Sequence, residues 1–199
     1  MIAPDVVERT LATALARGGD FAEVFAEDRQ NVTARLDDGR VEELVSGRSR
    51  GAGVRVVRGE STGFAHTADL SEVGLAAAAE AAAAASTEAG EPVRVAPLAA
   101  GCAPAPTVAV LPETVAKDAK VALLLRANAA AREQSGAIRQ VSASYADGRR
   151  RVLVANSDGV FAEDDQVRQR RGDRRHPRAG AQRHAHPVTV DVGSDGRPG

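Results

Sequence analysis

The first candidates for metal ligands in this 199-residue sequence are its four histidines, which are His66, His176, His184 and His186. The last three lie in one short segment that contains no large apolar residue. Nothing there would fix the imidazoles in one geometry, so we expect only adventitious, weak metal binding. His66 falls in an extended stretch, where a surface or hydrogen-bonded structural role is the simpler interpretation.

The only cysteine, Cys102, excludes an intrachain disulfide and any site built from several cysteines. It lies in a proline-rich segment without a basic neighbour to activate it, so we expect an inert thiol. This cysteine usage suits a reducing cytoplasm. The first residues include acids and lack an apolar run, which is not the pattern of a secretory signal.

Two pairs of adjacent acids, Glu42-Glu43 and Asp164-Asp165, are the candidates for acid–base work. Adjacent residues of a strand point to opposite faces, so we expect solvated strand edges rather than a shared-proton pair. The glycine-rich segment 51–53 is followed by extended residues. A phosphate-binding loop needs a helix there, so a turn is the better interpretation.

Composition places the chain among globular proteins, with 43% hydrophobic and 27% charged residues. Only 3% are aromatic, so the core must be built from small aliphatic side chains. No run is long and apolar enough to span a bilayer, and we expect no membrane association. The net charge of −1 conceals two parts of opposite charge. Residues 168–199 are basic, since they hold eight Arg and three Asp, and the residues before them are acidic.

Three segments have helical patterns. Apolar residues recur at helical spacing over 4–17, an alanine-rich stretch of high helix propensity follows Ser71 over 71–86, and Pro112 opens a third pattern over 112–134. Between the second and third patterns, five prolines predict a connecting loop over 86–112.

Extended patterns fill most of the rest. Asp37-Asp38-Gly39-Arg40 predicts a tight hairpin, since Asp-Gly favours turns with positive φ. We interpret 41–45, 53–57 and 62–65 as short strands separated by turns at Gly47, Gly51 and Gly59. Further turns are predicted at 147–148 and 156–159. The fold class is therefore α+β, a twisted and mostly antiparallel sheet with three covering helices.

Residues 168–187 contain no Val, Ile, Leu, Met, Phe, Tyr or Trp. Such a segment cannot bury enough apolar area to offset its ordering entropy, so we expect one domain over 1–167 and a disordered, Arg-rich tail over 168–199. Its residue types are those of GC-rich codons, and we interpret the tail as a frameshift product. Arginines attract phosphates, but without aromatic platforms we expect no specific nucleic-acid binding.

Several ordered motifs resemble one family. They are Leu36-Asp37-Asp38-Gly39-Arg40-Val41-Glu42-Glu43, Gly51-Ala52-Gly53-Val54-Arg55-Val56-Val57, Gly63-Phe64-Ala65 with Thr67-Ala68-Asp69-Leu70-Ser71, Tyr145-Ala146-Asp147 and Asn156-Ser157-Asp158-Gly159-Val160. Over about 5–167 the chain resembles the amino-terminal domain of the TldD/PmbA family, zinc metallopeptidases also described as modulators of DNA gyrase. The motif around Phe64 is closer to the TldD subunit than to its PmbA (TldE) partner.

The resemblance implies a cytoplasmic peptidase with a peptide substrate and a TldD/TldE-type partner subunit. It also implies a zinc ion held by a His-Glu-x-x-x-His helix, but no histidine of this sequence precedes a glutamate. We therefore expect no catalytic, cofactor-binding or metal-binding residues and no cofactor in this chain, and an amino-terminal fragment that is inactive alone. The alternative is a non-catalytic PmbA/TldE-like assembly or peptide-binding subunit.

Overall fold

The computed structural model describes residues 1–86, 94–101, 108–134, 138–177 and 188–191. The helices are α1 (Pro4–Leu15), α2 (Glu72–Ala85) and α3 (Lys117–Glu133), preceded by the 3₁₀ turn η1 (Pro112–Thr114). The strands are β1 (Phe21–Asp37), β2 (Arg40–Arg58), β3 (Ser61–Thr67), β4 (Ala99–Ala100), β5 (Ile138–Asn156), β6 (Val160–Pro177) and β7 (Val188–Asp191).

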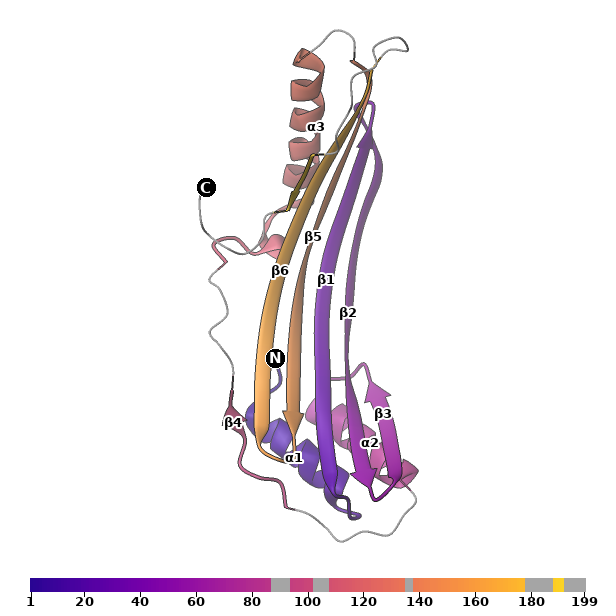
Figure 1. Ribbon diagram of the computed structural model, residues 1–199, viewed down its shortest axis with the longest axis vertical. Helices are drawn as coiled ribbons and strands as arrows, with labels where there is room; N and C mark the ends of the chain where they lie inside the picture. Colours follow the sequence, from indigo (N-terminus) through magenta and orange to yellow (C-terminus); the bar gives the residue numbers. More distant parts are fainter. Residues whose placement is uncertain (87–93, 102–107, 135–137, 178–187, 192–199) are drawn as a thin grey trace. The chain divides into compact units, whose positions relative to one another are not determined.

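Among the described residues the strands form one sheet in the order β3-β2-β1-β5-β6-β4, with β7 beside β6 (Figure 1). Pairing of β2 with β3 and of β6 with β7 is antiparallel, whereas the short β4 pairs with β6 in parallel. The three expected helices are present, α1 and α2 with nearly the expected ends, whereas α3 begins at Lys117 and the expected start at Pro112 forms the separate turn η1. The α+β class is therefore confirmed.

The chain divides into two compact units. Unit 1 comprises Met1–Arg29, Ser49–Ala105 and Arg150–Asp165, and unit 2 comprises Gln30–Arg48, Pro106–Arg149 and Gln166–Gly199. Four strands, β1, β2, β5 and β6, contribute residues to both units.

Unit 1 is built around α1 and α2, which pack against each other. Leu11, Leu15 and Leu75 from these helices are buried with Val54 and Val56 of β2 in one apolar cluster. The start of α2 is fixed by Ser71, whose Oγ accepts a hydrogen bond from the backbone N–H of Gly74 at 3.2 Å. This is the N-cap expected for a helix that follows a serine.

Unit 2 is built around α3 and strand residues that face it. Leu124 of α3 is buried against Ala34 and Leu36 of β1 and against Ala143 and Tyr145 of β5. The alternating burial along β1 and β5 places these residues on one face of the sheet.

The hairpin predicted at 37–40 is confirmed. Asp38 and Gly39 have φ of 48° and 83°, the pair of positive values that a type I′ turn requires. The turns predicted at Gly59 and at 156–159 are also present, with positive φ at Gly59 and Gly159.

The turns predicted inside β2 and β5 are wrong, because both strands run without interruption. The glycines there allow close backbone approach instead. A Cβ on Gly51 would lie 3.0 Å from the carbonyl oxygen of Thr67, and one on Gly148 would lie 2.9 Å from that of Gln30.

The loop predicted over 86–112 contains β4 in its described part, and its residues 87–93 and 102–107 lie outside the described residues. In the tail, β6 continues past the expected boundary at 167 to Pro177, and β7 pairs with it. Backbone pairing in a ladder does not require apolar side chains. Residues 178–187 and 192–199 lie outside the described part of the chain.

Candidate functional site

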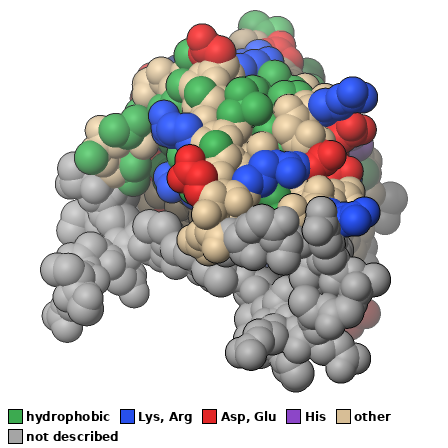
Figure 2. All heavy atoms as spheres, turned by 90° about the horizontal axis from the view of Figure 1, so that it is seen from above, with side chains coloured by type: hydrophobic (Ala, Val, Ile, Leu, Met, Phe, Trp, Pro, Cys, Tyr) green, Lys and Arg blue, Asp and Glu red, His purple; other side chains and the backbone are tan. Residues whose placement is uncertain are grey.

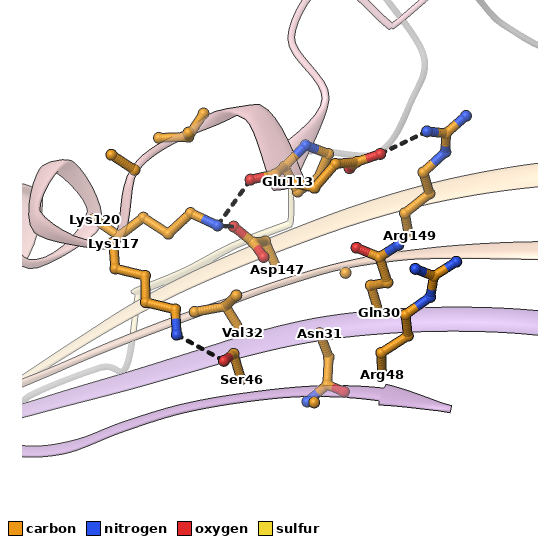
Figure 3. A pocket seen from close by; sticks show the side chains of 15 residues that line it. Gln30, Asn31, Val32, Ser46, Arg48, Glu113, Lys117, Lys120, Asp147 and Arg149 are labelled. Atoms are coloured by element: carbon orange, nitrogen blue, oxygen red, sulfur yellow. Dashed lines mark hydrogen bonds and ion pairs between the residues drawn. The ribbon is translucent and has the colours of Figure 1, made fainter. Parts of the chain in front are cut away.

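A recess of about 420 Å³ lies within unit 2, where η1 and the first turn of α3 meet β1, β2 and β5 (Figure 3). Its side chains come from segments far apart in the sequence. They are Gln30, Asn31, Val32, Ser46, Arg48, Pro112, Glu113, Val115, Ala116, Lys117, Lys120, Asp147 and Arg149, with Gly47 and Gly148 between them.

The local sequence positions the helical side of the recess. Pro112 opens η1, and its carbonyl oxygen accepts a hydrogen bond from the Lys120 Nζ at 2.9 Å. Ala116 lies just before α3, so Lys117 and Lys120 fall in the first helical turn. This places two ammonium groups over the strands.

The central contact is a buried ion pair. The Nζ of Lys120 lies 2.6 Å from Oδ2 of Asp147, and each side chain is only 2% exposed. The same oxygen of Asp147 accepts a hydrogen bond from the Tyr145 hydroxyl at 2.5 Å. The Lys120 ammonium also lies 5.8 Å from the centre of the Tyr145 ring, within the range of a cation–π contact.

The environment holds the Tyr145 hydroxyl in its protonated form. Burial, followed by its hydrogen bond to Asp147 and the negative charge of that residue, raises the pKa of Tyr145 to about 12. Gln169 donates a hydrogen bond to the same hydroxyl at 3.2 Å. Tyr145 therefore acts here as a hydrogen-bond donor at neutral pH and not as a base.

Two further contacts lie at the rim of the recess, and both are drawn in Figure 3. Lys117 Nζ donates to Ser46 Oγ at 2.8 Å, and Arg149 pairs with Glu113 at 2.6 Å. The amide side chain of Gln30 adds a donor and an acceptor beside them. The recess therefore offers polar groups around carboxylates that already have cationic partners.

These residues do not fit a zinc ion. Zinc sites combine His, Cys or carboxylate ligands, whereas Asp147 and Glu113 are held by Lys120 and Arg149. Within the described ranges, no group of three His, Cys, Asp or Glu side chains could hold a metal ion. The arrangement suits binding through hydrogen bonds better than metal or acid–base chemistry.

The residues singled out from the sequence are not brought to this recess. His66 lies in β3 with its ring stacked on Phe64 at 6.4 Å between centroids. Glu42 and Glu43 are adjacent in β2, and Glu43 lies 4.0 Å from Arg35. Asp164 and Asp165 are adjacent in β6, in the manner of strand neighbours that face opposite ways.

The remaining candidate residues, a cysteine and three histidines, lie wholly or partly outside the described part of the chain. Cys102, His184 and His186 lie outside the described residues, and the side chain of His176 is also outside them. The interpretation of these residues as an inert thiol and an adventitious metal site stays a prediction.

Sequence reasoning missed the buried ion pair. Tyr145 and Asp147 are two apart in a strand, so the pattern alone places them on one face. Nothing in the sequence pairs Asp147 with Lys120, whose neighbours in α3 are mostly exposed.

The surface of the described residues carries both signs of charge. In the view of Figure 2, Lys and Arg side chains lie beside Asp and Glu side chains and are interspersed with apolar ones. None of the helices in the described part is long and apolar enough to cross a membrane.

Comparison with known proteins agrees with the resemblance inferred from the motifs. The model of PmbA/TldA metallopeptidase domain 1 matches residues 22–86, and that of the PmbA/TldA metallopeptidase central domain matches residues 111–172. The metalloprotease TldD homolog of Haemophilus influenzae is 31% identical over 155 residues, which make up 74% of this chain and 31% of that protein. The chain thus spans about a third of the length of this curated relative.

Solved structures share the fold. A proposed modulator of DNA gyrase from Bacteroides thetaiotaomicron matches 93% of this chain and 43% of its own, with a TM-score of 0.67 and 17% identity. TldE from Thermococcus kodakarensis matches 94% of this chain and 42% of its own, with a TM-score of 0.67 and 13% identity. The two domain matches and the identity to the TldD homolog show that the chain belongs to the PmbA/TldD metallopeptidase family, of which it carries domain 1 and the central domain.

Proposed function

We propose that this chain supplies the non-catalytic amino-terminal part of a TldD-like zinc metallopeptidase that processes peptides. The observation that carries the proposal is the ordered match to domain 1 and the central domain, together with 31% identity to a TldD homolog over 155 residues. Because no histidine of this sequence precedes a glutamate, the zinc ligands would come from residues outside it.

In this proposal the recess of unit 2 contacts the peptide substrate. Its volume of about 420 Å³ lies in the range of small-ligand pockets and could hold a few residues of an extended chain. Ser46, Gln30 and Lys117 offer hydrogen-bonding groups that suit a peptide backbone. The neighbouring ion pair between Lys120 and Asp147 would keep the wall of the recess in one arrangement.

Peptide contact at the recess is tested by amide chemical shifts. We expect an unstructured peptide to shift the signals of residues 30–32 and 46–48, and we expect Ser46→Arg, which fills the recess, to abolish those shifts. Ser49→Arg is the matched control, because Ser49 is exposed and does not line the recess. Shifts that survive Ser46→Arg would exclude the recess as the contact.

The scaffold role is tested by a chimera. Residues 22–172 replace the matching segment of the Haemophilus influenzae TldD homolog, and zinc content and peptide cleavage are both measured. We expect zinc-dependent cleavage that Ser46→Arg reduces without loss of zinc. A folded chimera that contains zinc but does not cleave peptides would contradict the scaffold role.

The second candidate is a PmbA/TldE-like subunit that assembles with a catalytic partner. The absence of His followed by Glu in this sequence favours it. The two candidates make different predictions about the gene sequence. If the tail over 168–199 is a frameshift product, another reading frame beyond codon 167 should restore a hydrophobic strand pattern, and a His-Glu-x-x-x-His motif further along would support a TldD-like peptidase.

The proposal places the chain in the cytoplasm, beside a TldD/TldE-type partner subunit. A single cysteine fits a reducing compartment, where disulfides do not contribute to stability. Fractionation of cells that produce the chain, followed by recovery of a family partner with it, tests both parts.

A further inference from the structure

The recess of unit 2 has more cationic than anionic side chains among the described residues that line it. The cations are those of Arg48, Lys117, Lys120 and Arg149, and the carboxylates are those of Glu113 and Asp147. Lys120 is paired with Asp147 at 2.6 Å, and Arg149 is paired with Glu113 at 2.6 Å. Both carboxylates are therefore neutralised, and an anion that enters the recess meets no uncompensated negative charge from them.

Lys117 is a cation of the recess that contacts a neutral group instead of a carboxylate. Its Nζ donates to the Oγ of Ser46 at 2.8 Å, and no carboxylate of the described residues lies within ion-pairing distance of it. An ammonium group has three N–H donors, so this contact leaves two of them for a ligand. Because Arg48 makes interactions of its own, the available charge is that of Lys117.

Lys117 and Ser46 offer two neighbouring donors to the same ligand. Figure 3 shows the two side chains pointing toward one another from α3 and β2. The Ser46 oxygen accepts from Lys117 and keeps its own O–H to donate, and the amide of Gln30 adds N–H donors to the lining. A carboxylate only accepts, has two oxygens and forms stronger hydrogen bonds than a neutral acceptor does. It is the peptide group that matches this pair of donors.

We propose that the recess selects peptides that place a carboxylate against Lys117 and Ser46, which are its specificity-determining residues. This inference rests on the proposed function, which places the peptide in the recess. The carboxylate belongs to an acidic side chain or to the C-terminus of the peptide. Val32 and Ala116 line the recess as well and suit the methylene groups of a glutamate side chain. A lysine in the same place brings its ammonium group against that of Lys117.

The selection is measured with peptides that differ at one position. Three glycine-serine peptides with a central Glu, Gln or Lys, each acetylated and amidated, are titrated into the isotope-labelled full chain, and the amide shifts of 30–32 and 46–48 give the affinities. We expect the Glu peptide to bind about fivefold more tightly than the Gln peptide, and the Lys peptide to bind least tightly. A Gln peptide with a free C-terminal carboxylate distinguishes the two sources, because only recognition of the terminus makes it bind more tightly than its amidated form.

Substitutions at Lys117 test whether this residue causes the preference. Lys117→Met keeps the length of the side chain and removes its charge, so the Glu and Gln peptides should bind equally well. Lys117→Glu should make the Lys peptide the preferred one. Arg126→Met is the matched control, because it removes one positive charge from an exposed position of the same helix that does not line the recess. The preference for Glu should persist in this variant.

The outcomes separate this inference from the proposed function. Equal affinity of the wild-type chain for the Glu and Gln peptides would overturn the selection of carboxylates and would leave the peptide contact intact. A preference for Glu that survives Lys117→Met, or that Arg126→Met also removes, would overturn the role of Lys117. If none of the peptides shifts the signals of 30–32 and 46–48, the peptide contact and the selection are both wrong.

Discussion

Lys120 Nζ and Asp147 Oδ2 lie 2.6 Å apart, and the two side chains are 98% removed from solvent. They come from α3 and β5, which are consecutive elements of the chain. The pair therefore ties the helix of unit 2 to its strands at the wall of the recess. Buried charges of this kind are costly unless each finds its partner.

Removal of one partner should destabilise the chain strongly. Lys120→Met removes the cationic partner of the buried Asp147 carboxylate and leaves it beside the Tyr145 hydroxyl, and we expect a loss of about 3–5 kcal/mol in the free energy of unfolding. Denaturant unfolding measures it. The double variant Lys120→Met/Asp147→Leu should recover much of the loss. Lys117→Met, at an exposed position, should stay within about 0.5 kcal/mol. A loss below about 1 kcal/mol for Lys120→Met, typical of an exposed pair, would contradict this account.

We expect Tyr145 to lose its hydroxyl proton at a higher pH than an exposed tyrosine does. The chain contains one tyrosine and no tryptophan, so the ultraviolet absorbance of tyrosinate reports this residue alone. We expect a midpoint near 12 in the folded chain and near 10 in denaturant, because burial and Asp147 raise the pKa in the folded state. Between these values the unfolded chain has lost the proton that the folded chain keeps, so the free energy of unfolding should fall as pH rises. A folded-state midpoint near 10 would show that the hydroxyl is not held as described.

Gly63 should not tolerate a side chain. A Cβ at this position of β3 would lie 1.9 Å from the Ala82 carbonyl oxygen and 2.9 Å from the Ser86 nitrogen, both at the end of α2. Gly63→Ala must move the strand away from the helix, and we expect a loss of about 3 kcal/mol in the free energy of unfolding. Gly101→Ala is the matched control, because no atom of the described residues beyond its chain neighbours lies within 4 Å of its Cβ position. Equal stability of the two variants would contradict the packing of β3 on α2.

The N-cap of α2 should contribute measurably to the free energy of unfolding. Ser71→Ala removes the acceptor for the Gly74 N–H, and we expect a loss of about 1 kcal/mol in the free energy of unfolding. Ser71→Asp keeps an acceptor at the same position and should retain most of the stability. If Ser71→Ala and Ser71→Asp lose the same amount, the hydrogen bond is not the cause.

The sequence alone predicts those structural features that depend on a local rule. Asp38 and Gly39 form the predicted hairpin because only such residues adopt positive φ readily, and Ser71 begins a helix because its side chain caps it. The α+β class followed from the alternation of these local signals.

Prediction from the sequence fails for glycine, which serves both in turns and inside strands where another backbone segment comes close. The sequence pattern predicts turns at Gly51 and Gly148, yet each lies inside a long strand where a neighbouring carbonyl comes close. The buried pair of Lys120 with Asp147 was not predicted either. Burial of a lysine depends on a partner from another element, and the pattern of the helix does not contain that partner.

Zinc binding by the purified chain is the decisive measurement for the proposed function. Under the proposed function the zinc ligands come from residues outside this sequence, so the purified chain should not compete with a chromophoric chelator for stoichiometric zinc. It should also cleave no peptide when zinc is supplied. One tightly bound zinc per chain, together with peptide cleavage that a chelator abolishes, would contradict the account.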